Sequence, residues 1–364
     1  MKIGFDLRFV QNELYSRFVI QLVKAYIKEN KENEYIIYSN EFIPGFEEKN
    51  ITNKNIHIKN GSFSEQIDFL KILKKDDNNL MVFFNHFKPI NYKGQYITLV
   101  GGLKDIYYMN FYSYFEKYKY LFLMGKNLKK SNKIICLDQN TKNELIEKFD
   151  IVESNIEMIN GFFPDSEEIE DKILDNDETI GKINIKTKYS IQNDFFIYSG
   201  GDSIEKNYEK LISVITRLNN SGHIVDLVFL GNNISSNINL RNLILENKIE
   251  KNIYFLGDVG LTHKKHLYNE CLGVIFPSFY EPFPFRLTEP LFFNTQILTS
   301  DLKNIRNIFE ENVTYFSPIS VNSIYENTKK YLEEKNNEKK VNYKNIKIKY
   351  TKENSVKQLN QIIG

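Results

Sequence analysis

Two glutamates eight positions apart are the side chains best placed to do chemistry in this sequence. Glu281 and Glu289 lie in the segment GVIFPSFYEPFPFRLTEPLFFNTQILTSD. The pattern predicts an apolar strand, then a tight loop that carries Glu281, then a helix from about Phe285 that carries Glu289. The start of such a helix attracts anions. Two carboxylates beside it would suit the hydroxyl groups of a sugar and of a ribose.

A second segment, FFIYSGGDSIEKNYEKLISVITRL, has the features of a phosphate-binding loop. Gly200 and Gly201 follow an apolar strand, and glycine lets the backbone approach a ligand closely. Lys206 and Asn207 open an amphipathic helix, where the ammonium of Lys206 could neutralise a phosphate. A third segment, NIYFLGDVGLTHKKHLYNE, repeats the order of strand, glycine and helix. Its loop could hold a nucleobase through backbone contacts.

The elements that must position these residues alternate along the whole chain. Short apolar strands are separated by longer amphipathic stretches, which is typical of a parallel, doubly wound α/β sheet. Thr141 with Glu144 three positions later predicts the start of one helix. Strands are expected at residues 2–7, 34–39, 55–59, 80–84, 96–100, 133–137, 156–159, 195–200, 225–231, 252–257, 273–278, 296–300 and 313–317. In folds of this kind, ligands bind at the carboxyl ends of the strands.

A polar segment at 165–188 interrupts the series of strands, so we expect two domains of similar size. The predicted boundaries are an N-terminal Rossmann-like domain at 1–170, a linker at 171–185 and a C-terminal Rossmann-like domain at 186–345. The amphipathic stretch within 346–364 is expected to form a last helix that packs back toward the first domain.

Composition excludes several classes of function. The 364 residues include 48 Lys and Arg and 47 Asp and Glu, so the net charge of +1 argues against nucleic-acid binding. No apolar run reaches the ~20 residues that span a bilayer, and the N-terminus is too charged for a signal peptide. Cys136 and Cys271 are too few for a disulfide framework or a zinc site. We expect both to be buried thiols in a reducing cytoplasm.

Taken together, the three segments resemble the donor-binding domain of the retaining glycosyltransferases of family four, which have the GT-B fold. The motifs that carry the resemblance are SGGDSIEKN, YFLGDV and PSFYEPFPFRLTEP, in this order. The N-terminal half fits more loosely, through MKIGFDLRF, SNKIICLDQNTKNELIEKF and EMINGFFPD. The resemblance covers nearly the whole chain. It implies two Rossmann-type, doubly wound α/β domains that face a central cleft, with the donor bound by the C-terminal domain and the acceptor by the N-terminal one.

The resemblance also implies roles for individual residues. Glu281 would bind donor-sugar hydroxyls near the reacting carbon, Glu289 the ribose and Lys206 the pyrophosphate, so Glu281 and Lys206 are the catalytic candidates. Val259 would contact the base through its backbone. The remaining donor-binding candidates are Gly200, Gly201, Asn207, Phe283, Phe285 and Leu287. The donor would be a UDP- or GDP-sugar, and the family needs no essential metal and no further cofactor.

The acceptor side departs from the family pattern. The segment VQNELYSRF has no Gly-Gly after the first strand, and Gly101-Gly102 stand where the family usually has His-Asp. Arg8, His86 and Asp105 are the candidates that could take the place of the missing histidine.

The donor side departs as well. Glu205 replaces the arginine that the family has before Lys206. Pro282 and Pro284 replace two glycines, and proline has no N–H to offer a ligand. Losing one phosphate cation costs on the order of 1–3 kcal/mol of hydrogen bonding to charged groups.

The expected function is hexosyl transfer from a nucleotide-sugar to a glycan, lipid-linked or protein acceptor, with retention of configuration. The location implied is the cytoplasm, and peripheral association with the inner face of the membrane is a further option. One alternative is a non-catalytic GT-B-like partner or regulator of an active glycosyltransferase. Another is a nucleotide-sugar epimerase, because fold does not fix function.

Three further patterns have plainer explanations. His263 and His266 are expected to be a surface pair, since no third metal ligand is apparent. Asp175-Asn176-Asp177 resembles a metal-binding Asp-x-Asp motif but lies in a polar linker. The aromatic stretch at 106–133 is expected to be a core stripe, with an acceptor wall or a membrane-interface helix as the alternative.

Overall fold

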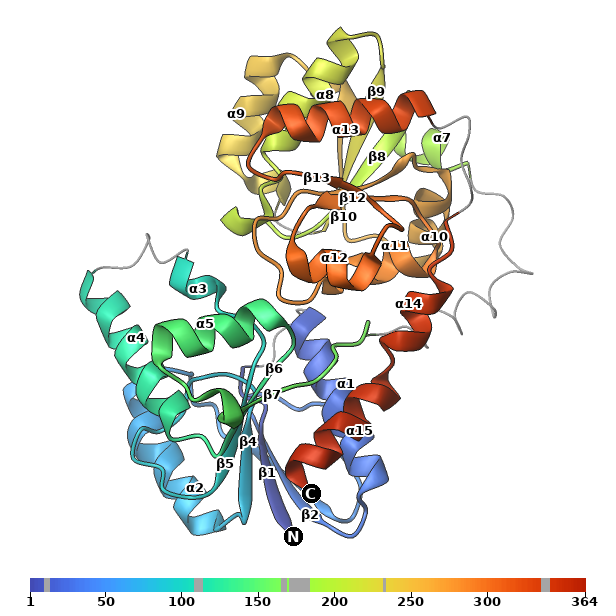
Figure 1. The fold of residues 1–364 in the computed structure, drawn as a ribbon. Coiled ribbons are helices and arrows are strands. Elements are labelled where there is room, and N and C mark those ends of the chain that lie inside the picture. The colour runs from blue at the N-terminus through green and yellow to red at the C-terminus, as the bar shows by residue number, and fades with distance from the viewer. Residues whose placement is uncertain (10–13, 108–113, 165–168, 170–183, 232–233, 335–340) are drawn as a thin grey trace. The chain divides into compact units, whose positions relative to one another are not determined.

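The computed structural model describes residues 1–9, 14–107, 114–164, 169, 184–231, 234–334 and 341–364. The chain divides into two compact units (Figure 1). Unit 1 comprises Met1–Pro164 and Lys349–Gly364, and unit 2 comprises Asp165–Ile348. Almost all of the expected linker, including the Asp-x-Asp-like motif, lies outside the described residues.

Unit 1 is built on a parallel sheet of seven strands. Its strand order is β3 (Ile51–Asn55), β2 (Glu34–Ser39), β1 (Lys2–Asp6), β4 (Leu80–Phe83), β5 (Tyr96–Val100), β6 (Lys133–Cys136) and β7 (Ile156–Met158). The accompanying helices are α1 (Leu14–Glu29), the π-helical turn η1 (Glu65–Phe69), α2 (Leu70–Asp76), α3 (Lys104–Tyr107), α4 (Tyr114–Lys129), α5 (Gln139–Phe149) and α15 (Lys352–Ile363). The direction of winding reverses between β1 and β4, which makes the carboxyl ends of these strands the topological switch point.

Unit 2 repeats the plan with a parallel sheet of six strands. Its strand order is β10 (Ile253–Gly257), β9 (Val225–Leu230), β8 (Asp194–Ser199), β11 (Gly273–Phe276), β12 (Ile297–Ser300) and β13 (Thr314–Phe316). The helices are α7 (Ile185–Tyr189), α8 (Lys210–Asn220), α9 (Ile238–Asn247), α10 (Leu261–Glu270), α11 (Thr288–Phe292), α12 (Lys303–Phe309), α13 (Val321–Glu334) and α14 (Lys344–Lys349). The switch point here lies between β8 and β11.

Strand β8 shows why this sheet is covered on both faces. Successive side chains of a strand point to opposite faces. Phe196 and Tyr198 join one apolar cluster with α8, α9 and α13, whereas Phe195 and Ile197 join another with α7 and α10. All four side chains are fully buried. Helices accordingly lie on both sides of the sheet (Figure 1), and a strand buried on both faces reads as a continuous apolar run.

One predicted strand is misplaced. The sequence indicates a strand at 55–59, but β3 spans Ile51–Asn55 and pairs with β2, with Tyr35 opposite Ile51. β3 lies at the edge of the sheet, so its residues are half-buried or exposed and carry little apolar signal. His57 has a φ of 44°, which ends the extended conformation where the prediction continued it.

The start of α5 also differs from the prediction. Asp138, three residues before Thr141, is the N-cap, and one of its carboxylate oxygens accepts hydrogen bonds from the N–H groups of Asn140 and Thr141. The hydroxyl of Thr141 donates to the same carboxylate at 2.6 Å. Aspartate and threonine are both good caps, and here aspartate takes the position.

Unit 1 is completed by the last helix of the described chain, α15, which lies along α1 (Figure 1). Asn360 accepts a hydrogen bond from Asn30 at 2.9 Å and donates one to Glu29 at 2.8 Å. Ser355 donates to the carbonyl of Asn160 at 2.6 Å. Val356 and Leu359 of the same helix are fully buried. The chain therefore leaves unit 1 after Pro164 and returns to it from Lys349.

The two cysteines differ in burial. Cys136 is fully buried in β6, and burial raises the pKa of its thiol to about 12. Cys271 is only half-buried, at the end of α10, so the expectation that both thiols are buried is wrong for this one. Both are free thiols.

A buried lysine lies beyond the end of β4. Lys88 is 2% exposed, and its Nζ donates to the carbonyl of Asn127 at 3.0 Å. The same ammonium lies 3.3 Å from the ring centroid of Tyr96 and 5.4 Å from that of Phe83. Burial, with a smaller contribution from the charge of Lys130, lowers the pKa of Lys88 well below its usual 10.5.

This lysine predicts a pH dependence of stability. Between the lowered pKa of folded Lys88 and 10.5, the unfolded chain binds one proton more than the folded chain. Stability therefore rises with pH across that window. We expect Lys88→Met to flatten this rise, measured as the urea midpoint of unit 1 at several pH values above 7. The matched variant Lys71→Met, which removes an exposed lysine of α2, should keep the slope of the unmodified protein. An unchanged slope in Lys88→Met would contradict the prediction.

Candidate functional site

The candidate donor site lies at the switch point of unit 2, where strands β8 and β11 end. The loop after β8 contains Gly200 and Gly201 and leads through the turn η4 (Ile204–Lys206) to α8. The loop after β11 contains Glu281 and leads through the turn η7 (Phe285–Leu287) to α11. Because parallel neighbouring strands end at the same edge of the sheet, the two loops meet.

An ion pair joins the two loops. The Nζ of Lys206 contacts the Oε1 of Glu281, and their side chains are 12% and 7% exposed. The backbone N–H of Phe279 donates to the carbonyl of Glu205 at 2.8 Å, which adds a second link. The sequence predicted both charged residues at this site, and the structure places them in direct contact.

Glu289 lies in a second polar cluster of the same unit. Its carboxylate accepts a hydrogen bond from the hydroxyl of Tyr268 at 2.9 Å and forms an ion pair with the Nζ of Lys264 at 2.8 Å. The side chains of Lys264 and Glu289 are 21% and 24% exposed. Both partners come from α10, so this helix fixes the carboxylate while one side of it stays open to solvent.

Close backbone approaches shape the loop after β8. A Cβ on Gly200 would lie 2.2 Å from the hydroxyl oxygen of Tyr198, so no larger residue fits there without a shift. The side chain of Asn207 donates to the carbonyls of Pro277 and Pro318, both at 2.9 Å. Asn207 has a φ of 54°, a left-handed conformation that asparagine tolerates well. The side chain of Asn207 therefore ties the loop to the rest of the unit.

The remaining donor-binding candidates have buried side chains. Phe283, Phe285, Leu287 and Val259 are all less than a tenth exposed. The N–H of Phe285 donates to the carbonyl of Phe283, and that of Leu287 to Pro284, both at 2.9 Å. These side chains therefore offer little surface to a ligand, and the N–H groups of Phe285 and Leu287 are already used. Contacts with a ligand would come from the remaining backbone groups of the four residues.

A short helical segment begins at Phe285 and carries Glu289, as predicted. It consists of the single turn η7 and the five residues of α11. Pro290 inside α11 contributes no N–H, and the N–H groups of Phe285 and Leu287 in the turn donate within the loop. The N–H groups of Phe285 and Leu287 are therefore not available to an anion at this helix start.

Three polar residues near the candidate site were missed by sequence reasoning. Lys264 and Tyr268 lie in α10 and hold Glu289, and Arg286 lies in η7. A Cβ on Gly201 would be 3.3 Å from the Nη2 of Arg286. The signal was available for Lys264 and Tyr268, because positions four apart share one helix face. Arg286 stands inside the motif PSFYEPFPFRLTEP, but its proximity to Gly201 arises only when the two loops fold together.

Burial raises the pKa of Tyr198 well above its usual value, and the charge of Arg286 acts in the opposite direction. Glu281 and Glu205 add smaller contributions that raise it. The Tyr198 hydroxyl donates to the carbonyl of Gly201 at 2.9 Å. The charges of these side chains therefore act on one buried hydroxyl at the end of β8.

Arg8, a candidate on the acceptor side, is fully buried in unit 1. Its Nε and Nη2 donate to the two oxygens of Asp6, both at 2.8 Å, and Nη2 also donates to Glu65 at 2.9 Å. The guanidinium carbon lies 3.7 Å from the ring centroid of Phe69. Burial raises the pKa of Glu65, and Arg8 opposes that shift. Arg8 thus connects the end of β1 to η1 and has no exposed group for an acceptor.

The other acceptor-side candidates follow β4 and β5. His86 is half-buried, and burial with the charge of Lys88 lowers its pKa to about 3, so it is neutral at pH 7. Gly102 has a φ of 148°, and a Cβ on Gly101 would lie 2.4 Å from the ring of Tyr15. Asp105 belongs to α3, but its side chain is outside the described part of the structure.

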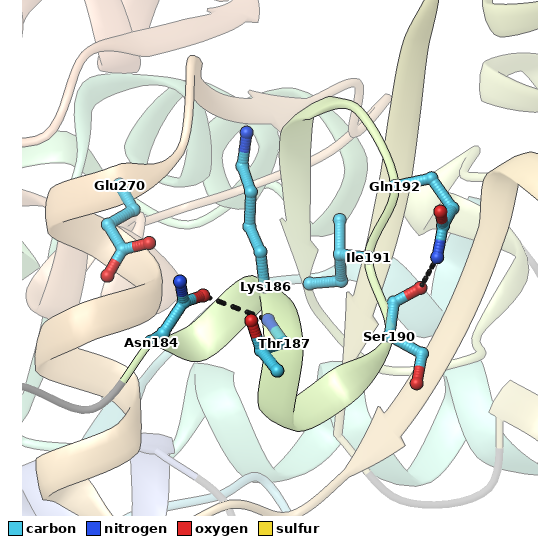
Figure 2. Close-up of a pocket in the computed structure, with 7 residues that line it drawn as sticks. All are labelled: Asn184, Lys186, Thr187, Ser190, Ile191, Gln192 and Glu270. Carbon is cyan, nitrogen blue, oxygen red and sulfur yellow. Dashed lines mark hydrogen bonds between the residues drawn. The ribbon is translucent and has the colours of Figure 1, made fainter.

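A shallow depression in unit 2 lies away from these loops. It is lined by Asn184, Lys186, Thr187, Ser190, Ile191, Gln192 and Glu270 (Figure 2). Most of these residues precede β8, so the depression lies at the opposite edge of the sheet from Gly200. Asn184 accepts from the N–H of Thr187, and Gln192 donates to the carbonyl of Ser190, both at 2.9 Å. Because ligands of such sheets bind at the carboxyl ends, the loops after β8 and β11 remain the candidate site.

The described ranges contain neither a metal-binding cluster nor a membrane-spanning helix. No group of three or more His, Cys, Asp or Glu side chains there could hold a metal ion. His263 contacts Tyr189 and Lys188 at 2.7 and 2.9 Å. No helix in those ranges combines the length and apolar character needed to cross a membrane.

Residues 181–348 match the family model described as Glycosyl transferases group 1. This segment coincides with most of unit 2. Among curated proteins, the O-antigen chain mannosyltransferase RfbU of Salmonella typhimurium is 20% identical over 249 residues. The alignment covers 68% of this chain and 64% of that relative, so this chain spans less than two thirds of its length.

Solved structures resemble the whole chain. A glycosyltransferase from Rickettsia africae has a TM-score of 0.71 at 14% identity, over 99% of this chain and 97% of that one. HepE of Anabaena, in complex with UDP-glucose, has a TM-score of 0.71 at 13% identity, over 100% and 98%. These likenesses confirm the predicted fold, which consists of two Rossmann-like parallel-sheet units of the GT-B type.

Proposed function

We propose that this protein, whose residues 181–348 match the group 1 glycosyltransferase model, transfers a hexosyl unit from a nucleotide-sugar to a glycan, lipid-linked or protein acceptor with retention of configuration. The observation that supports the proposal most strongly is the engagement of Glu281 by Lys206 and of Glu289 by Lys264 and Tyr268. Two positioned carboxylates with adjacent cations, near the ends of β8 and β11, suit a ligand that has both hydroxyl and phosphate groups.

The proposed chemistry is stabilisation of a leaving group. When the bond from the sugar to the phosphate breaks, negative charge develops on the departing nucleoside diphosphate. A fixed ammonium near that charge, such as that of Lys206, stabilises the transition state without reorganisation. Glu281, held by Lys206, would accept hydrogen bonds from the sugar hydroxyls and orient the reacting carbon.

Glu289 is proposed to bind the ribose. A carboxylate accepts hydrogen bonds only, so it suits a diol that donates two. Lys264 and Tyr268 hold Glu289 from α10, which leaves the open side of the carboxylate for the ligand. Val259 lies in the loop just before α10 and is proposed to contact the base through its backbone.

For the donor we propose a UDP- or GDP-hexose, and for the acceptor a cell-envelope glycan. The curated relative is named a mannosyltransferase of the O-antigen chain, and HepE was solved with UDP-glucose. Both names fit a hexose carried on a nucleoside diphosphate. No essential metal is part of this proposal.

Calorimetric and thermal-shift titration with a panel of UDP- and GDP-sugars tests the proposal. A ligand at 100 times its Kd should stabilise the fold by roughly 2.7 kcal/mol. We expect one sugar nucleotide to bind, and Glu281→Ala and Glu289→Ala to weaken that binding. The matched variant Glu270→Ala changes a glutamate of the depression in Figure 2 and should bind normally.

Acceptor screening with the donor so identified then separates the alternatives. Release of free nucleoside diphosphate together with an elongated acceptor would support transfer, and the anomeric signal of the product in NMR would report retention or inversion. Conversion of the sugar without release would favour an epimerase. Absence of binding to every sugar nucleotide would overturn the proposal and favour a non-catalytic partner of an active glycosyltransferase.

A further inference from the structure

Arg286 differs from the other two cations near the candidate donor site. Lys206 is paired with Glu281, and Lys264 is paired with Glu289. Within the described part of the chain, Arg286 forms neither an ion pair nor a hydrogen bond. It is half-buried, so its charge is close to the protein interior yet reachable. Of these three cations, Arg286 is thus the one whose charge no carboxylate neutralises.

The position of Arg286 is set by the glycine loop. Its Nη2 lies 3.3 Å from the place that a Cβ on Gly201 would occupy. Because Gly201 has no side chain, the guanidinium and the loop backbone border the same space. The charge of Arg286 also reaches the Tyr198 hydroxyl, as do the charges of Glu281 and Glu205. Arg286 is therefore near Gly201, in the loop that follows the carboxyl end of β8.

The surrounding loop has few other groups for an anion. Pro282 and Pro284 have no N–H, and the N–H groups of Phe285 and Leu287 already donate within the loop. Glu205, which precedes Lys206, is buried and accepts a hydrogen bond from Ser203 at 2.7 Å. A diphosphate brought here needs positive charge, and the Lys206–Glu281 pair has no net charge to give.

We propose that Arg286 binds the diphosphate of the donor beside Gly201 and supplies the net positive charge that this loop otherwise lacks. The inference rests on the proposed function, and it deepens that function by naming a phosphate-binding residue. A guanidinium is well suited to this task because its planar fork makes two parallel hydrogen bonds to phosphate oxygens and keeps its charge at any physiological pH.

The test compares ligands that differ only in phosphate. Uridine, UMP and UDP, and the matching guanosine series, are titrated into the full chain and into Arg286→Met and Arg286→Lys by calorimetry. We expect Arg286→Met to weaken binding of the diphosphate by about 10- to 100-fold, the loss that corresponds to charge-assisted hydrogen bonds. The monophosphate should lose less and the nucleoside should be unchanged. The diphosphate affinity of Arg286→Lys should lie between those of the unmodified protein and Arg286→Met, because lysine keeps the positive charge but lacks the planar fork of the guanidinium.

Arg217→Met, which removes a cation from the end of α8, is the matched control and should bind all ligands normally. Equal diphosphate affinity in Arg286→Met and the unmodified protein would overturn the inference while the proposed function stands. An equal loss for the nucleoside and the diphosphate would also overturn it, because Arg286 would then act on the shape of the loop. If the unmodified protein binds none of the nucleotides, the proposed function fails and the inference with it.

Discussion

Replacing Lys206 with methionine is expected to lower the rate of the proposed sugar transfer by about 10²- to 10³-fold, the usual effect of removing one group that stabilises developing charge. The loss has two sources in this structure. The cation beside the leaving diphosphate disappears, and the carboxylate of Glu281, only 7% exposed, loses its partner. An unpaired carboxylate would repel the diphosphate, so donor affinity should fall together with kcat.

A double variant separates these two sources. In Lys206→Met/Glu281→Gln the repelling charge is absent, so donor affinity measured by calorimetry should recover part of the way while kcat stays low. Such non-additivity is the signature of residues in direct contact. Lys186→Met, which removes a lysine at the opposite edge of the sheet, is the matched control. A double variant that binds donor as weakly as Lys206→Met would show that the ion pair is not the reason for the loss.

Replacing Arg8 with methionine is expected to destabilise unit 1 by about 3–5 kcal/mol, because removing one member of a buried ion pair leaves uncompensated charge. Here two carboxylates, Asp6 and Glu65, would remain buried with no cation between them. Hydrogen exchange of the β1 and β2 amides measures the effect within unit 1 alone.

The pH dependence of this variant has a definite sign. Burial already raises the pKa of Glu65, and the loss of Arg8 would raise it further. A folded-state pKa above the unfolded value gives stability that is present at low pH and lost as pH rises. The destabilisation in Arg8→Met should therefore shrink as the pH is lowered toward the pKa of Glu65.

The matched control for Arg8→Met is the triple variant Asp6→Asn/Arg8→Met/Glu65→Gln. It removes all three charges, and such replacements are often nearly neutral. Protection of β1 in the triple variant should therefore approach that of the unmodified protein. If the triple and single variants were equally unstable, the hydrogen bonds of Arg8 rather than its charge would explain its importance.

Much of the fold could be predicted because the strands of a parallel sheet are buried on both faces. Apolar runs such as FFIYS and GVIF are stable only when both of their faces are buried. In the structure they form β8 and β11, the two central strands of the unit 2 sheet. The position of edge strand β3 was predicted wrongly because its residues, ITNKN, are largely exposed. Exposed residues need not be apolar, so the sequence shows no apolar run there. The predicted start of α5 was wrong for a different reason: Asp138, a better N-cap residue than threonine, stands three positions before Thr141.

The candidate site was predictable only where its chemistry depends on residues that are adjacent in sequence. Glu281 and Lys206 were found through motifs, and parallel strands bring their loops together. The burial of Arg8 could not be foreseen, because its partner Glu65 is 57 positions away. Arg286 was missed for a similar reason: its relation to Gly201 exists only after both loops fold.

The return of the chain to unit 1 through α15 sets the order in which the protein can be finished during synthesis. Unit 2 is one continuous stretch, Asp165–Ile348, and all of it is made before α15. The usual order, in which the N-terminal domain folds first as the ribosome proceeds, therefore cannot be completed here before unit 2 is made. The buried side chains of Val356 and Leu359 reach unit 1 only after all of unit 2 has been synthesised. Because segments of unit 1 flank unit 2 on both sides, one cut in the chain cannot separate the two units cleanly.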